Sequence, residues 1–222
     1  MSPEDRQLRA DAERNRRRLL AAAQAVFCER GLDVGVAEIA QRAGVGRGTL
    51  FRNFPTKDAL IAAIVVERMG EAASRGRILV EAQDPGAALF EFVDELAGRQ
   101  QLDRALFEAV ADAWLANPEI RAAHAEVMEV LEQLLTRAQE AGAVRADVGA
   151  MDILIQLKGV CGVAGAFSQI DAAIVERQLD LMRAALSVPG TPQPLRGRTP
   201  TAQDIERAYA PSAPSGRLAE RS

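Results

Sequence analysis

The sequence is poor in the residues that build catalytic and metal sites. Its 222 residues include one histidine, His124, and two cysteines, Cys28 and Cys161. Glu126 stands two positions after His124, and residues two apart do not share a helical face, so the pair suits neither metal binding nor acid–base chemistry. The sequence has no GxSxG motif, no P-loop and no GxGxxG after a strand. We therefore predict no enzyme activity, no catalytic residues, no metal and no cofactor.

Disulfide frameworks and membrane spans are also missing. Cys28 and Cys161 are far apart, and neither belongs to a CxxC pair or a Cys/His cluster, so both are expected to be reduced thiols. No stretch of 18 apolar residues lacks a charge, which argues against a membrane span. The polar, Arg-rich N-terminus lacks the apolar region of a signal peptide. We expect a cytoplasmic protein with no membrane partner.

Aromatic residues make up only 4% of the chain, whereas Ala and Leu are abundant and 48% of all residues are hydrophobic. This composition favours helices, and no alternation with the period of a strand is present, so we expect an all-α fold. Residues 1–10 are polar and are expected to be disordered. Apolar spacing, with Gly and Pro at the ends, predicts helices at 12–30, two short ones within 36–54, then 57–75, 84–98, 101–116, 118–141, 151–167 and 174–186.

Positive charge is concentrated at one end of the chain. The formal net charge is −4, but residues 1–57 contain 11 Lys or Arg and 7 Asp or Glu, whereas the remainder contains 16 and 24. A basic module attached to an acidic body is typical of a DNA-binding head with a separate body that does not bind DNA.

Within the basic module, the spacing of apolar residues and glycine at 36–54 indicates two short helices joined by a tight turn. Ile39 and Ala40 form the inner face of the first helix, Gly44 lies in the turn, and Leu50 and Phe54, four apart, form the inner face of the second. The outer face of the second helix has small, polar or basic side chains: Arg47, Gly48, Thr49, Arg52 and Asn53. Such a helix fits a DNA major groove, although an ordinary helix hairpin shows the same pattern.

The residues on either side of this hairpin follow a definite pattern. Before it stands Arg16-x-x-Leu19-Leu20-x-Ala22-Ala23-x-x-x-Phe27-x-Glu29-x-Gly31, and after it stands Phe54-x-x-Lys57-Asp58-x-Leu60. In order and spacing, the run from Arg16 to Leu60 resembles the DNA-binding domain of the TetR family of bacterial transcriptional regulators. The rest of the chain is too generic to carry a resemblance beyond its helical character.

The resemblance implies an N-terminal arm and three-helix helix-turn-helix domain at 1–56. It further implies a helical ligand-binding and dimerisation domain at 57–188, whose first helix connects the two. Residues 189–222 hold six of the ten prolines and are expected to form a flexible tail. The implied function is that of a homodimeric, ligand-responsive repressor, released from palindromic double-stranded DNA by an unknown small molecule. A helical protein–protein adaptor that does not bind DNA is the alternative.

The outer face of the second short helix supplies the candidate base contacts. Arg47 and Thr49 are assigned to bases, with Arg52 as a further candidate, and Gly48 lets the backbone approach the DNA. Phe51 stands where the family usually has Tyr. Because Phe51 cannot donate a hydrogen bond, it either packs or touches a thymine methyl group.

Three further residues are candidates for the DNA backbone. Lys57 lies at the start of a helix, where the dipole and the ammonium together suit a phosphate, and the resemblance assigns it that contact. Asn53 can bond a phosphate or a base edge. Arg16 is carried over from the family as a possible backbone contact, although a solvated helix start explains it equally well.

The body offers two further predictions. Its glycine-rich helix indicates close approach of another backbone, either from a second copy of the chain or from within one chain. The candidate dimer residues are Gly159, Gly162, Val163 and Ala166. The candidate lining of a ligand pocket is Phe90, Phe107, Trp114, Met128, Leu131, Leu154 and Lys158. Each pocket residue is also consistent with an ordinary core position, and Lys158 equally suits a ligand, an interface or solvent.

Overall fold

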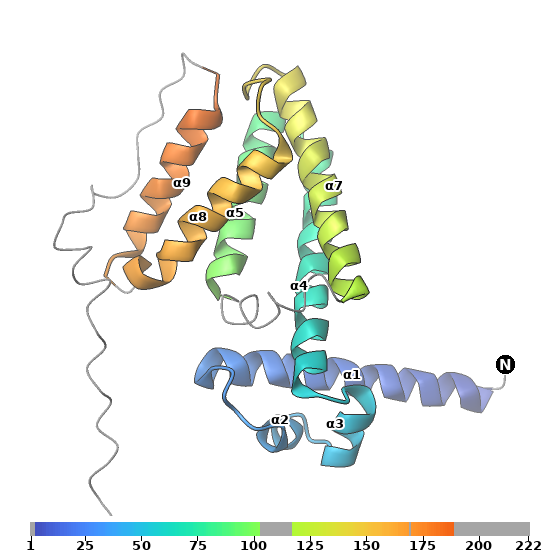
Figure 1. The fold of residues 1–222 in the computed structure, drawn as a ribbon. Coiled ribbons are helices and arrows are strands. Elements are labelled where there is room, and N and C mark those ends of the chain that lie inside the picture. Colours follow the sequence, from blue (N-terminus) through green and yellow to red (C-terminus); the bar gives the residue numbers. More distant parts are fainter. Residues whose placement is uncertain (1–2, 103–116, 169, 189–222) are drawn as a thin grey trace, which may run out of the picture. The chain divides into compact units, whose positions relative to one another are not determined.

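The computed structural model describes residues 3–102, 117–168 and 170–188 (Figure 1). Within these ranges the chain is helical, and its sole β-type pairing is an isolated bridge between Val144 and Ser187. The all-α prediction is confirmed. The helix predicted at 101–116 lies outside the described residues except for its first two positions, and the tail at 189–222 lies wholly outside them. The chain divides into two compact units, Met1–Ala138 and Gln139–Ser222, while the predicted domain boundaries stay a prediction.

The first unit begins with α1 (Pro3–Arg30), α2 (Val36–Arg42) and α3 (Arg47–Asn53). The prediction of disorder at 1–10 is wrong from Pro3 onward, because α1 already begins there. Proline suits the first position of a helix, where its missing N–H is not needed.

The three N-terminal helices share an apolar core that matches the predicted inner faces. Its buried members are Leu19, Ala23 and Phe27 of α1, Ile39 and Ala40 of α2, Leu50 of α3 and the adjacent Phe54. Gly44, in the turn between α2 and α3, has φ of 67°, a left-handed conformation that glycine adopts without steric cost. The core and this turn together fix the direction of α3.

Helix α4 (Lys57–Val80) follows α3 after a short link and is longer than the predicted 57–75. Its N-cap is Thr56, as predicted, and the Thr56 hydroxyl accepts the backbone N–H of Ala59 at 3.0 Å. Further along α4, Gly76 is buried against two other helices, α5 (Pro85–Leu102) and α7 (Pro118–Glu140). A Cβ at position 76 would overlap Val130 Cγ1 and lie 2.7 Å from Phe92 Cε2. Glycine therefore lets α5 and α7 pack directly on the α4 backbone.

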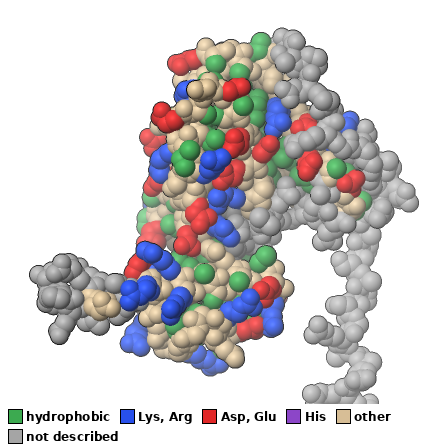
Figure 2. All heavy atoms as spheres, turned by 180° about the vertical axis from the view of Figure 1, so that it is seen from behind, with side chains coloured by type: hydrophobic (Ala, Val, Ile, Leu, Met, Phe, Trp, Pro, Cys, Tyr) green, Lys and Arg blue, Asp and Glu red, His purple; other side chains and the backbone are tan. Residues whose placement is uncertain are grey.

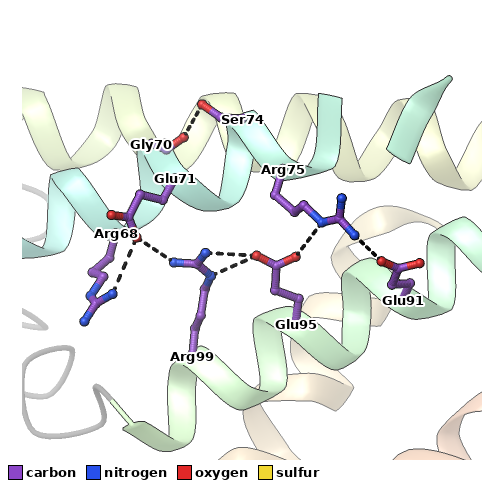
Figure 3. A network of polar contacts seen from close by, with 8 residues as sticks. All are labelled: Arg68, Gly70, Glu71, Ser74, Arg75, Glu91, Glu95 and Arg99. Atoms are coloured by element: carbon purple, nitrogen blue, oxygen red, sulfur yellow. Dashed lines mark hydrogen bonds and ion pairs between the residues drawn. The ribbon is translucent and has the colours of Figure 1, made fainter. Parts of the chain in front are cut away.

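A chain of alternating charges also joins α4 to α5 (Figure 3). Arg75 pairs with Glu91 and approaches Glu95 at 3.7 Å, and Arg99 bridges Glu95 at 2.9 Å and Glu71 at 3.0 Å. We call these five residues the charge ladder. Burial lowers the pKa of Arg99, but its hydrogen bonds to Glu71 and Glu95 outweigh this, so that its pKa is raised. Partly exposed pairs of this kind contribute about 0.2–1 kcal/mol each.

The second unit contains α8 (Ala150–Ser168) and α9 (Ala172–Leu186), which pack on each other. Asp171 caps α9 by accepting the N–H of Ala173 at 3.0 Å. The Gln139 side-chain amide donates to the carbonyls of Arg145 and Val148, which closes the loop before α8. None of the helices in the described ranges combines the length and the apolar character that crossing a membrane requires.

Candidate nucleic-acid interface

The buried residues of α3 determine which of its side chains face solvent. Leu50 and Phe54 are 1% and 2% exposed, so they anchor the helix against its neighbours. The backbone of the turn is held by Val45 N–H donating to the carbonyl of Ala40 at 3.0 Å. The side of α3 away from this core is solvent-accessible, with Arg47, Gly48, Phe51 and Arg52 exposed and Thr49 and Asn53 half-buried.

Two polar side chains of this surface are bound to the backbone of α3 itself. Arg52 Nε donates to the carbonyl of Gly48 at 3.1 Å, and Asn53 Nδ2 donates to the carbonyl of Thr49 at 2.8 Å. Both side chains therefore lie along the helix rather than extending from it. Two other large side chains of this surface are exposed: Arg47, in the first turn, and Phe51, with 45% of its surface exposed. Among the bonds that the structure describes, neither side chain is bound to the α3 backbone.

Lys57 lies at the start of α4, where a phosphate site was predicted. Its Nζ donates to the carbonyl of Leu32, in the link that follows α1, and stands 5.9 Å from the centre of the Phe27 ring. The ammonium thus ties the beginning of α4 to the end of α1. Its contact with a phosphate stays a prediction, and it now requires this ammonium to serve two partners or to exchange them.

Arg16 also has a partner within the protein. Its guanidinium carbon lies 4.6 Å from the centre of the Phe54 ring, a cation–π arrangement. Arg16 therefore helps to hold α1 over the end of α3. Its assignment to the DNA backbone stays a prediction.

Sequence reasoning missed the polar contacts that fasten α1 to its neighbours. Arg42 of α2 forms a double hydrogen bond with Glu29, at 2.7 and 2.6 Å, and Gln24 donates to Glu67 of α4 at 2.9 Å. The hydrogen bonds from Arg42 hold the pKa of Glu29 below its usual value. These partners are 13 and 43 positions apart, and no local spacing could have paired them. These bonds hold α1 against α2 and α4, the helices on either side of α3 in the sequence.

The charge of the molecule is distributed as the sequence indicated. In the view of Figure 2, Lys and Arg side chains gather over the lower part, formed by α1–α3 and the start of α4. Acidic side chains are more frequent over the remainder of the first unit in the same view. A positive surface around an exposed helix favours contact with a phosphate backbone.

The predicted pocket residues are distributed over both units. Phe90 and Met128 are half-buried and Leu131 is buried in the first unit, whereas Leu154 is half-buried and Lys158 exposed in the second. Phe107 and Trp114 lie outside the described residues. The pocket stays a prediction.

The predicted dimer surface lies on α8. Gly159 and Gly162 are exposed, and the side chains of Val163 and Ala166 lie outside the described residues. Sequence reasoning missed two exposed apolar side chains, Met151 (54%) and Ile155 (63%), although their spacing of four could have indicated a shared face. Helical spacing places both on the side of α8 that carries the two glycines. The dimer surface stays a prediction.

Two family models match the chain. Residues 19–64 match the model described as bacterial regulatory proteins, tetR family, and residues 84–188 match the C-terminal domain of SbtR-like transcriptional regulators. The chain belongs to the TetR family. The first match contains the whole α2–α3 hairpin and the start of α4, which confirms the resemblance inferred from Arg16 to Leu60.

Individual relatives, two of them of known structure, match this protein over more than half of its length. The TetR transcription regulatory protein of Mycobacterium vanbaalenii is 37% identical, with a TM-score of 0.62 over 82% of this chain and 99% of the other. The TetR regulator SCO0520 of Streptomyces coelicolor is 30% identical, with a TM-score of 0.63 over 79% and 99%. The HTH-type transcriptional repressor Rv1474c of Mycobacterium tuberculosis is 33% identical over 60% of this chain and 71% of its own length.

These matches establish the TetR-family protein as a DNA-binding transcriptional regulator. They also confirm the predicted architecture, an N-terminal helix-turn-helix followed by a helical C-terminal domain. A helical adaptor that does not bind DNA, the alternative reading of the sequence, is set aside. Members of this family regulate transcription, and they typically do so as dimers that bind DNA operators and small-molecule effectors.

Proposed function

We propose that this regulator is a homodimeric repressor that occupies a palindromic operator and leaves it when a small molecule binds in the helical body. The observation that carries this proposal is the exposed surface of α3, which is held rigidly by the buried Leu50 and Phe54 and surrounded by basic side chains. The sign of regulation is supported by the relative Rv1474c, which is named a repressor.

In the proposed complex, α3 lies in the major groove. Arg47 is exposed at the first turn and can form two hydrogen bonds to a guanine, the commonest specific contact in such grooves. Gly48 is exposed and has no side chain, so the helix backbone can approach the bases closely. Thr49 is half-buried and supplies a hydroxyl for a base edge.

Phosphate contacts come from residues already fixed by the fold. Arg52, the further candidate for a base contact, lies along α3, and its N–H groups other than Nε can bind a phosphate. Asn53 and Lys57 reach a phosphate by sharing or exchanging their carbonyl partners, and Arg16 contributes positive charge from above Phe54. Contacts of this kind determine register and affinity rather than sequence preference.

Dimerisation is assigned to α8 and α9. On α8, Met151 and Ile155 present apolar surface beside the exposed Gly159 and Gly162, which allow close approach of a second helix. Pairing α8 and α9 with their symmetry mates gives a four-helix bundle with the two-fold symmetry that a palindromic operator demands.

Helix α4 is the proposed lever between effector and DNA. It starts directly after α3 and is tied to α1 by Gln24–Glu67 and by Lys57–Leu32. At its other end it packs on α5 and α7 at Gly76 and is joined to α5 by the charge ladder. An effector that displaces α5 would move α4 and change the spacing of the two α3 helices. A coupling of about 1–3 kcal/mol is sufficient for a useful switch.

A salt titration tests the DNA-binding part of the proposal. The full-length protein is titrated with a library of genomic fragments at several salt concentrations. We expect selective binding with a steep negative salt dependence, because displaced counterions drive phosphate contacts. Selective binding identifies the operator, whereas a folded dimer that binds all fragments equally would contradict the proposed site.

Lys57→Ala separates the two roles of this residue. If Lys57 binds a phosphate, the variant should reduce the salt slope by about one per subunit and weaken all sequences alike. If its ammonium only ties α4 to Leu32, thermal stability should fall while the salt slope stays unchanged. The second result would remove Lys57 from the proposed interface.

Arg47→Ala tests the assignment of a base reader. We expect a loss of about 1–3 kcal/mol on the operator and relaxed preference at one base pair of each half-site. Arg121→Ala, which removes the same charge from the exposed side of α7, is the matched control and should leave specificity unchanged. Equal weakening of operator and random DNA by Arg47→Ala would contradict its role.

A reporter assay at a promoter tests whether the protein represses or activates transcription. A reporter fused to the identified operator should be silenced by the wild-type protein and released by Arg47→Ala. Effectors are then sought as compounds that raise the midpoint of thermal unfolding and weaken operator binding together, since a ligand that favours the free state must do both. Activation of the reporter by the wild-type protein would overturn the repressor assignment.

A further inference from the structure

The recognition surface contains an aromatic side chain that its neighbours do not cover. Phe51 keeps 45% of its surface exposed, although Leu50 on the same helix and Phe54 directly after it are almost completely buried. Exposing so much aromatic surface to water is unfavourable, because burial of apolar area stabilises by about 25 cal/mol per Å². A contact that covers this ring is therefore favourable for binding.

The surroundings of Phe51 favour contact with the floor of the groove. Gly48, three positions earlier, lies beside it on the helix surface and has no side chain to cover the ring. Arg52 and Asn53 are bound to the carbonyls of Gly48 and Thr49, so both side chains run along α3. The Phe51 ring consequently stands next to Gly48, where the absence of a side chain lets the α3 backbone approach the bases.

The chemistry of the ring selects its partner. Phenylalanine has no hydrogen-bonding group, so it cannot read the donors and acceptors of a base edge or bind a phosphate through a hydroxyl. The apolar group that base pairs present in the major groove is the C5 methyl of thymine. We propose that Phe51 is a specificity residue that reads a thymine methyl group in each operator half-site. This inference rests on the proposed placement of α3 in the major groove.

The test removes the methyl group without changing the hydrogen-bonding edge. Once the operator is known, each thymine is replaced in turn by uracil, and binding of the full-length protein is measured. At one position per half-site, we expect uracil to lower affinity about fourfold, the effect of losing one buried methyl group. Substituting both half-sites should lower affinity about 15-fold if the two contacts are independent. With a C·G pair at that position, 5-methylcytosine should bind about fourfold more tightly than cytosine.

Variants of the protein assign the effect to the ring. Phe51→Ala should bind the thymine operator more weakly and lose its preference for thymine over uracil at that position. Phe51→Leu, which keeps an apolar side chain, should retain part of the preference. Arg47→Ala should weaken binding but keep the full preference, because its contact is to another base. Circular dichroism melts confirm that the variants are folded.

The outcomes separate this inference from the function on which it rests. Selective binding with no uracil-sensitive position, or an operator half-site without thymine, would overturn the inference and leave the regulator intact. A uracil effect of equal size in wild type and Phe51→Ala would assign the methyl group to another residue. Absence of any selective binding would overturn the placement of α3 in the groove, and the inference with it.

Discussion

Replacing Gly76 with alanine should destabilise the protein, although alanine is the better helix former. In an open helix the exchange is favourable by about 1 kcal/mol. At Gly76, however, the added Cβ would overlap Val130 Cγ1 and stand 2.7 Å from Phe92 Cε2, well inside the usual 3.5–4.0 Å separation of carbon atoms. Both neighbours are buried and have little room to move. Overpacking of this kind costs about 1–3 kcal/mol, and after the gain in helix propensity is subtracted we expect a net loss of up to about 2 kcal/mol.

Gly70→Ala is the matched control. Gly70 lies on the same helix, and a Cβ built there meets nothing within 4 Å. This variant should gain up to about 1 kcal/mol, which places the two alanine variants about 1–3 kcal/mol apart, the cost of the overpacking alone. Urea denaturation followed by far-UV circular dichroism measures the difference, provided that protein concentration is held constant, because the proposed dimerisation would contribute to apparent stability.

A third variant decides whether the cost arises at the contact itself. Val130→Ala in the Gly76→Ala background should recover part of the lost stability, since the two changes share one contact and are not additive. If Gly76→Ala were as stable as Gly70→Ala, the direct packing of α5 and α7 on the α4 backbone would be refuted.

Three further perturbations test other contacts. Thr56→Ala should cost about 1 kcal/mol in urea denaturation by removing the α4 cap, and Thr56→Ser should not. Burial raises the pKa of Cys161 to about 11, so partial alkylation at pH 8 should modify the exposed Cys28 first. Mass spectrometry measures the order, and modification of Cys161 before Cys28 would contradict the burial of Cys161. Because the hydrogen bond from Arg42 lowers the pKa of Glu29 from 4.5, this pair stabilises the fold above that pH, and the stabilisation is lost as the pH falls further. In Glu29→Gln, the free energy of unfolding should therefore fall less steeply with decreasing pH than in the wild type. An unchanged dependence on pH would argue against the pair.

Local signals in the sequence predicted the hairpin well because they act over a few residues. Leu50 and Phe54 are four apart and fall on one side of any α-helix, whatever surrounds it. Gly44 marks a turn that requires positive φ, and the structure has φ of 67° there. Thr56 precedes an acidic first turn and accepts the expected N-cap hydrogen bond. These features needed no knowledge of the partner helices.

Contacts between distant residues could not be predicted in this way. Lys57 was assigned to a phosphate from its position at a helix start, yet its ammonium reaches Leu32, 25 residues earlier. Arg16 lies over Phe54, 38 residues later, and this ring was expected only as part of the core. Gly76 carried no sequence signal, because the atoms that exclude a side chain there belong to α5 and α7. Spacing predicts which face of a helix a residue occupies, but not which residues of other helices pack against that face.

The two kinds of contact on α4 have different consequences for the proposed switch. The charge ladder is partly exposed, and its pairs, worth about 0.2–1 kcal/mol each, weaken further in salt. Val130 and Phe92 instead press against Gly76 inside the core, where close packing permits discrete rearrangements rather than gradual deformation. Displacement of α5 by an effector would therefore reach α4 chiefly through Gly76. Because the Gln24–Glu67 and Lys57–Leu32 contacts fasten the other end of α4 to α1, that displacement would be passed on to the surface that presents α3.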